Sequence, residues 1–135
     1  MLHTRLATLV FAAAACATSA FAVDGTTLIN QSTVMAAGGF PYTITASGSY
    51  RLSGDLLVTN STGINILAPN VTLDLNGFTI SCSSCSGFPG IVSNSVNMTV
   101  MNGMISGFGG IEAPPGGHIR LARCSKGLFK EKNND

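Results

Sequence analysis

The sequence predicts an all-β solenoid, in which short strands follow one another around a coil and equivalent strands of successive coils stack in parallel. Three observations predict this fold class. A sequence unit recurs along the chain with a period between about 20 and about 27 residues, the range of solenoid repeats. Within each unit, apolar and polar residues alternate with the period of two that is typical of a half-buried strand. The 135 residues include 16 glycines and no tryptophan, and 10% are charged, a composition that favours turn-rich β-structure over helical bundles.

The charge balance excludes some classes of partner. Seven basic and six acidic residues give a net charge of +1, so the chain lacks the basic patch that nucleic-acid binding requires. No uninterrupted run of 18 apolar residues occurs, and we therefore expect no transmembrane helix. The length is that of one domain.

The first element, residues 1–22, has the pattern of a secretory signal peptide. Arg5 supplies the positive start, an apolar stretch covers residues 6–17, and Ala20-Phe21-Ala22 is a small-x-small cleavage site. The pattern predicts a secreted or periplasmic protein. A lipoprotein anchored at Cys16 is the alternative. Residues 23–41 would then form a lead-in or cap before the first coil.

The coils are predicted by the repeat itself. The segment 70–81 is matched by 97–107, since both read asparagine, apolar, threonine, apolar, then Asn-Gly and a second apolar stretch. Three Gly-Ile pairs precede equivalent parts of successive units, at Gly63-Ile64, Gly90-Ile91 and Gly110-Ile111. Residues 118–121 take the place in the third unit that residues 97–100 take in the second. The chain is therefore a tandem array.

Alternation predicts which side chains face inward. Val71, Leu73 and Leu75 share one face of a strand, and Thr72, Asp74 and Asn76 share the other. We expect the inward residues to form apolar columns, and the bend asparagines to pass amide hydrogen bonds from coil to coil. Asn-Gly also signals a tight hairpin, but an antiparallel meander does not explain why the whole unit recurs.

These residues carry a resemblance to a known superfamily. Segment 64–110 resembles the right-handed parallel β-helix of exported bacterial proteins of the pectate-lyase-like superfamily, and segment 48–56 resembles their first coil. The resemblance covers residues 42–121. It implies a right-handed, single-stranded parallel β-helix of about three to four coils. Residues 122–135 carry six charged side chains and no alternation, and we expect an irregular charged tail there.

The resemblance also implies where catalysis would take place. Members that cleave polysaccharides use one outer face of the coil, the lyases with clustered carboxylates that bind calcium and the hydrolases with paired carboxylates. Asp55 and Asp74 are separated by close to one coil length and are the weak catalytic candidates of this chain. We expect Arg51 to pair with Asp55 across a glycine-containing turn, and His118 to fill a bend. No catalytic constellation and no cofactor are predicted.

The cysteines allow three interpretations. Cys82 and Cys85 have the CxxC spacing of a redox pair, of half a zinc site, or of a local disulfide bond. A zinc site would need Cys124 and His118 as further ligands, and their spacing matches no common zinc site. In an exported protein the pattern favours a disulfide bond that closes one loop.

Three functions are compatible with these observations. The first is a non-catalytic exported module that has a structural role or binds carbohydrate at a cell surface. The alternative is the N-terminal fragment of a pectate-lyase-like polysaccharide lyase or hydrolase whose active coils are absent. The third is a redox or metal module built on Cys82 and Cys85. Because an open coil end exposes unpaired backbone groups, we also expect edge-to-edge self-association.

Overall fold

The computed structural model describes residues 25–113 and 119–125. The predicted signal segment 1–22, His118 and residues 126–135 lie outside the described residues. Eleven strands and one helix occur in this part of the chain, in the order β1 (Thr26–Ile29), α1 (Gln31–Ala36), β2 (Tyr42–Ile44), β3 (Gly48–Leu52), β4 (Leu56–Val58), β5 (Ile64–Ile66), β6 (Val71–Asp74), β7 (Thr79–Cys85), β8 (Ile91–Ser93), β9 (Met98–Phe108), β10 (Ile111–Glu112) and β11 (Ile119–Ser125). Within this part, no helix is long and apolar enough to cross a bilayer.

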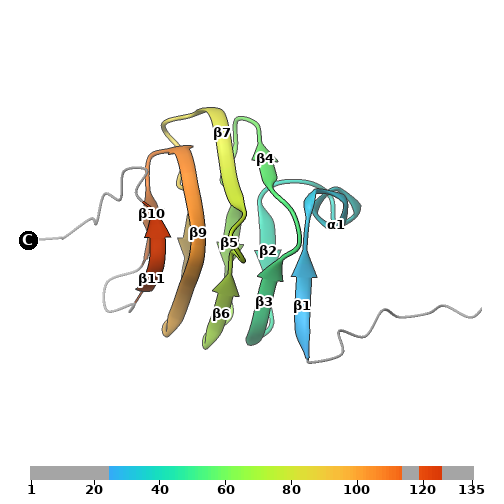
Figure 1. Cartoon of the computed structure of the whole chain (residues 1–135), viewed down its shortest axis with the longest axis vertical. Helices are drawn as coiled ribbons and strands as arrows, with labels where there is room; N and C mark the ends of the chain where they lie inside the picture. Colours follow the sequence, from blue (N-terminus) through green and yellow to red (C-terminus); the bar gives the residue numbers. More distant parts are fainter. Residues whose placement is uncertain (1–24, 114–118, 126–135) are drawn as a thin grey trace, which may run out of the picture.

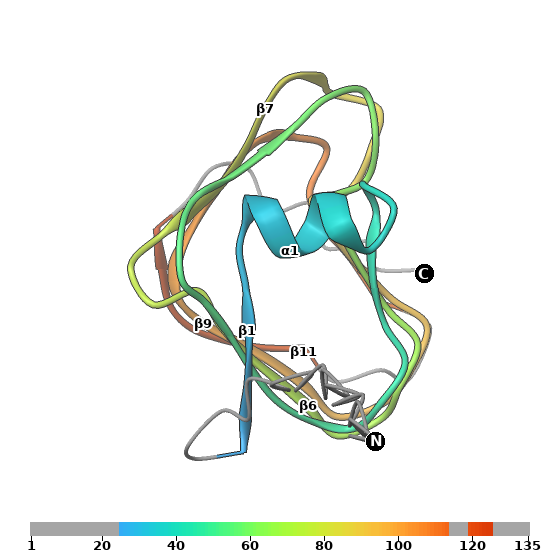
Figure 2. The same ribbon diagram turned by 90° about the vertical axis from the view of Figure 1, so that its right-hand side faces the viewer.

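The strands form a parallel β-solenoid of about four turns (Figures 1 and 2). A seven-stranded sheet has the order β1-β3-β6-β9-β7-β4, with β11 paired to β9, and a four-stranded sheet has the order β10-β8-β5-β2. The first half of β9 pairs with β6 and the second half with β7. The larger sheet therefore turns a corner within β9 and supplies two sides of the coil, while the smaller sheet supplies the third.

The pairing register confirms the repeat. Ile64, Ile91 and Ile111 of the three Gly-Ile pairs lie in register on successive coils. Val71, Met98 and Ile119 do the same on another side. Strand β11 continues to Ser125 in register with β9, so the coils reach further than residue 121, where the sequence analysis places their end.

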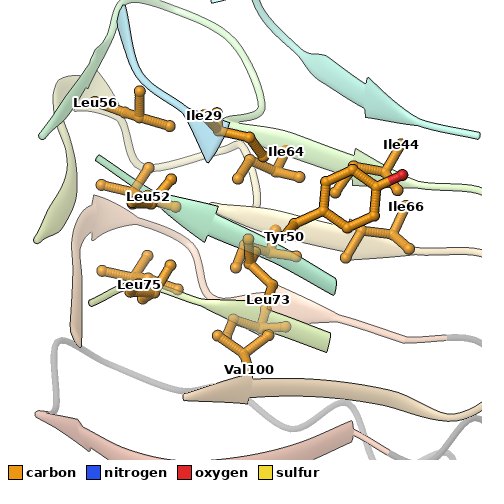
Figure 3. Packing of buried hydrophobic residues seen from close by; sticks show 14 of the residues in the cluster. Ile29, Ile44, Tyr50, Leu52, Leu56, Ile64, Ile66, Leu73, Leu75 and Val100 are labelled. Atoms are coloured by element: carbon orange, nitrogen blue, oxygen red, sulfur yellow. The ribbon is translucent and has the colours of Figure 1, made fainter. Parts of the chain in front are cut away.

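The predicted inward face forms the core. Val71, Leu73 and Leu75 are at most 1% exposed, whereas Thr72 and Asp74 are half-buried and Asn76 is exposed. Equivalent side chains stack in columns across the coils, as Figure 3 shows for Tyr50, Leu73 and Val100 and for Leu52 and Leu75.

Asparagines form the corners. Asn70 and Asn97 occupy one corner and Asn76 and Asn102 another, and all four have a left-handed backbone with φ between 52° and 60°. Asparagine tolerates this conformation better than most residues with a side chain. Asn97 Nδ2 donates to Asn70 Oδ1 at 3.1 Å, which confirms the predicted amide contact from coil to coil at this corner.

The N-terminal end is covered by α1, which lies across the coil opening (Figure 2). Asn30 caps the helix, accepting from Thr33 N at 3.0 Å, and Val34 is fully buried in the core. The Gln31 side chain accepts from Leu57 N at 3.0 Å and donates to Leu57 O at 3.2 Å. The Gln31 amide therefore takes the place of a neighbouring strand at the edge of β4, where it bonds both the N–H and the C=O of Leu57. The sequence pattern does not reveal this contact.

Burial of Tyr50 makes the stability of the solenoid depend on pH. Its side chain is 9% exposed and its hydroxyl donates to Ala46 O at 2.8 Å. Burial raises the pKa of Tyr50, with a further contribution from Tyr42. Because the folded state favours the protonated phenol, this contribution to stability is present below about pH 10 and is lost as the pH rises through the folded-state pKa.

We therefore expect the free energy of unfolding in urea to fall as the pH rises above about 10. The fall is expected to be smaller in Tyr50→Phe, which lacks the ionisable hydroxyl. Tyr42→Phe removes only the smaller contribution to the raised pKa of Tyr50, and it is expected to keep most of the fall. An identical pH dependence in wild type and Tyr50→Phe would contradict the assignment.

Candidate functional site

The outward face of the larger sheet carries a row of polar side chains. Ser49, Thr72, Thr99 and Arg120 lie in register on β3, β6, β9 and β11. Ser49 and Arg120 are exposed and the two threonines are half-buried. Neighbouring members are one strand spacing apart, about 4.8 Å. The coil thus presents two threonine hydroxyls, a serine hydroxyl and a guanidinium at regular intervals along one line, which we call the polar row.

Two residues further along these strands, the outward face carries an ion pair between Arg51 and Asp74. Arg51 lies in register with Asp74, and Arg51 Nε is 3.4 Å from Asp74 Oδ2. The Arg51 side chain is 42% exposed and that of Asp74 is 20% exposed. At this exposure the pair contributes little to stability. The expectation that Arg51 pairs with Asp55 is wrong, because the parallel register sets Arg51 beside the next coil instead of across its own turn.

Asp74 is occupied by structural contacts. Its Oδ1 accepts from the backbone N of Asn76 at 2.8 Å and from Nδ2 of Asn102 at 3.2 Å. Together with the Arg51 contact, these bonds connect three successive coils through one carboxylate. Both oxygens of Asp74 therefore have protein partners, and the residue holds the corner after β6.

Asp55 has a similar structural role on the other side of the same corner, one coil earlier. Its Oδ1 accepts from Thr79 N at 2.8 Å, and the following residue, Leu56, lies in register with Ile80. Thr79 is therefore the residue that follows Asp55 by one coil, whereas Asp74 follows Arg51 by one coil. Stacking thus places Thr79, and not Asp74, beside Asp55. The two carboxylates are therefore not in register on neighbouring coils.

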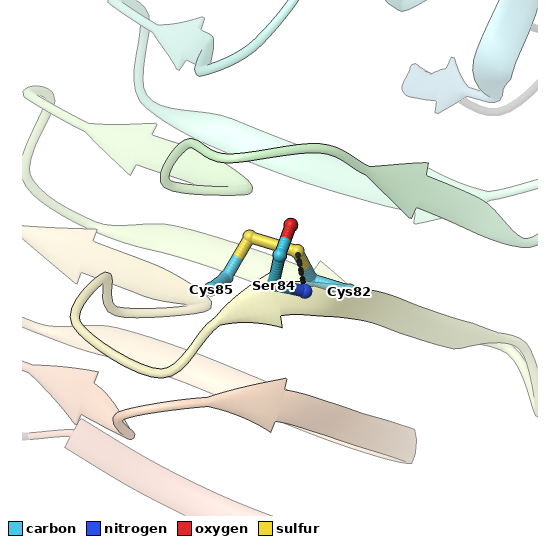
Figure 4. Close-up of a disulfide and its surroundings, with 3 residues drawn as sticks. All are labelled: Cys82, Ser84 and Cys85. Carbon is cyan, nitrogen blue, oxygen red and sulfur yellow. Dashed lines mark hydrogen bonds between the residues drawn. A yellow bond between two sulfur atoms is a disulfide. The ribbon is translucent and has the colours of Figure 1, made fainter.

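Cys82 and Cys85 are joined by a disulfide bond (Figure 4). Between Ser81 and Cys85 the register of β7 against β9 shifts, because four residues on β7 span the distance of two on β9. The disulfide bond closes this bulge. Cys82 is 7% exposed and Cys85 is fully buried, so neither sulfur is presented to solvent as a reactive thiol would be.

The remaining candidates add no chemistry to the described part of the chain. Within it, no group of three His, Cys, Asp or Glu side chains is placed to hold a metal ion. Tyr50 and Phe108 are buried, and Phe40, Tyr42 and Phe78 pack against the core, as the inward alternation of Phe78 predicts. Phe88 is 38% exposed.

Sequence reasoning identified Asp55 and Asp74 but missed the contacts that occupy them. It also missed the polar row, although the signal is present. Thr72 is the threonine of the Asn-apolar-Thr-apolar unit, and Thr99 is its counterpart one coil later.

No family model, curated protein or solved structure matches the chain. The structure shows parallel strands stacked as a β-solenoid.

Proposed function

We propose that the chain is an exported, non-catalytic β-solenoid module that binds a polysaccharide along the polar row. The observation that carries the proposal is the repetition of hydroxyl groups and a guanidinium in register from coil to coil. A polymer of repeating sugars offers hydroxyl groups at regular intervals, and a repeating protein surface can contact several of them at once. Hydroxyl side chains suit this ligand because each can donate and accept a hydrogen bond.

The hydrogen bonds that Asp55 and Asp74 accept support a non-catalytic role. Hydrolysis of a glycosidic bond requires an acid and a base or nucleophile in two carboxyl groups about 5–9.5 Å apart. The two carboxylates instead accept backbone hydrogen bonds on opposite sides of one corner, and the register does not pair them with each other. Export is supported by the signal pattern of residues 1–22 and by the disulfide bond, because disulfide bonds persist mainly in oxidising compartments.

Affinity electrophoresis in gels that contain polygalacturonate or a neutral polysaccharide tests the proposal. We expect the protein to be retarded by at least one of them, and the double variant Thr72→Val, Thr99→Val to lose retardation. Two lost hydrogen bonds of about 1 kcal/mol each correspond to a roughly 30-fold weaker Kd. Thr43→Val, on the outward face of the smaller sheet, is the matched control. No retardation by any polysaccharide, or an equal loss in the control, would contradict the proposal.

The same samples test for catalysis. Wild-type protein is expected to release neither unsaturated product, measured by ultraviolet absorbance, nor reducing sugar, with or without calcium. Turnover that disappears in the double variant Asp55→Ala, Asp74→Ala, while its circular dichroism spectrum stays that of the wild type, would show that the carboxylates act catalytically. The chain would then be a polysaccharide lyase or hydrolase.

A further inference from the structure

The Asn-Gly pair at the corner after β6 has a reactivity that the proposed function does not use. In such a pair the backbone nitrogen of the glycine can attack the side-chain amide carbon of the asparagine, because glycine has no side chain to hinder the approach. Asn76 and Gly77 are both exposed. Burial therefore does not protect this pair from the reaction, and its protection depends on its contacts.

Two hydrogen bonds hold the reacting groups apart. Asn76 Nδ2 donates to Leu52 O on the preceding coil at 3.2 Å. Gly77 N donates to Asn102 O on the following coil at 2.6 Å. In the five-membered ring that the attack would form, the amide carbon of Asn76 takes the position to which the N–H of Gly77 now points. Asn102 O occupies that position, and the bond to Leu52 O holds the Asn76 side chain toward the opposite coil.

We propose that Asn76-Gly77 is a site of spontaneous deamidation that the folded coil protects and that opening of the corner exposes. The bond from Gly77 N to Asn76 Cγ forms and the bond from Cγ to Nδ2 breaks. Nδ2 leaves as ammonia, which takes up the proton of the Gly77 amide. Water then opens the ring at either carbonyl group and gives aspartate or isoaspartate at position 76. The reaction uses water alone, and loss of ammonia makes it irreversible.

Each product weakens the corner. Aspartate has no N–H to donate to Leu52 O, and it adds a negative charge beside Asp74, whose Oδ1 accepts from the backbone N of Asn76 at 2.8 Å. Isoaspartate lengthens the main chain by one carbon atom before Gly77, and the Gly77 N–H then loses its register with Asn102 O. Deamidation therefore marks chains whose corner has opened, and these chains do not regain the original contacts between coils.

Asn60 offers a matched control. Its backbone is left-handed with φ of 50°, close to the 52° of Asn76, and both residues are exposed. Within the described residues, neither the side chain of Asn60 nor the backbone N of Ser61 makes a hydrogen bond. The variant Ser61→Gly therefore creates an Asn-Gly pair with a similar local backbone but without the two contacts that hold Asn76 and Gly77.

The experiment follows deamidation of the full chain with Ser61→Gly in mildly alkaline buffer. Peptide mass mapping locates each modified asparagine, and circular dichroism shows whether the variant is folded. In the folded chain, deamidation at Asn76 is expected to be roughly 30-fold slower than at Asn60, since two hydrogen bonds must break first. In urea that unfolds the chain, the two rates are expected to converge.

A second measurement tests the effect of the product. The urea midpoint of Asn76→Asp is expected to lie below that of Asn60→Asp, because only the change at Asn76 removes a side-chain hydrogen bond between coils. Equal midpoints would contradict the weakening of the corner.

Two rate results would overturn the proposal. Equal rates at Asn60 and Asn76 in the folded chain would show that the contacts do not protect the pair. Slow deamidation at Asn76 that persists in urea would show that the pair is unreactive whatever its fold. If Ser61→Gly does not fold, the wild-type rates at Asn76 with and without urea decide in the same way, and equal rates would overturn the proposal. Polysaccharide binding takes no part in the reaction, so its failure leaves these results unaffected.

Discussion

Replacement of Leu73 by aspartate is expected to abolish most of the stability of the solenoid. Leu73 is fully buried and stacks between Tyr50 of the preceding coil and Val100 of the next. Loss of the leucine side chain alone costs about 2–5 kcal/mol, and an unpaired carboxylate in the column adds several more. Because a domain of this size has about 5–15 kcal/mol in total, we expect an unfolded or barely folded chain at neutral pH.

The neighbouring residue supplies the control. Thr72 lies on the same strand but faces outward in the polar row, between Ser49 and Thr99. Thr72→Asp is expected to cost less than about 1 kcal/mol, in the range of surface substitutions. Urea unfolding followed by far-ultraviolet circular dichroism measures both. Similar losses at the two positions would mean that the inward and outward faces are assigned wrongly.

The success of the sequence analysis at Leu73 has a physical reason. Strand alternation has a fixed period of two, so one buried position determines the direction of every other side chain on the strand. The recurrence of Gly-Ile and of the asparagine corners then sets the register, since a shift by one residue would turn Ile91 out of the core. Fold and core are properties of the repeat, and the repeat is visible in the chain.

The contacts of Arg51 and Asp74 show what the repeat does not reveal. Alternation predicts only that both point outward. Their pairing depends on the length of the coil, and that length differs from one coil to the next, because loops of different length join the strands. A period that varies in this way cannot decide whether Asp74 lies beside Arg51 or beside Asp55. The N-terminal cap was missed for another reason, because Gln31 acts through its side chain as a substitute for a strand.

The tightest approach between coils predicts the second large effect. Gly107 has φ of 79°, and a Cβ atom there would overlap the carbonyl oxygen of Cys82 on the neighbouring coil. Gly107→Ala therefore combines the cost of a left-handed alanine, about 1 kcal/mol, with displacement of the bulge that the disulfide bond closes. We expect a total loss of at least about 3 kcal/mol in the free energy of unfolding, within the range typical of overpacked sites together with backbone strain.

Gly77 separates the two contributions. Its φ of 82° is nearly the same, but a Cβ atom there would have no atom within 4 Å. Gly77→Ala should therefore cost only the strain of the left-handed backbone, about 1 kcal/mol. Urea unfolding of both variants gives the collision cost as their difference, and equal losses would contradict the close approach. In a Cys82→Ser, Cys85→Ser background the bulge is no longer clamped, so residue 82 can move away from position 107. The cost of Gly107→Ala is then expected to decrease while that of Gly77→Ala stays the same, because only the former depends on how rigidly the disulfide bond holds the neighbouring coil.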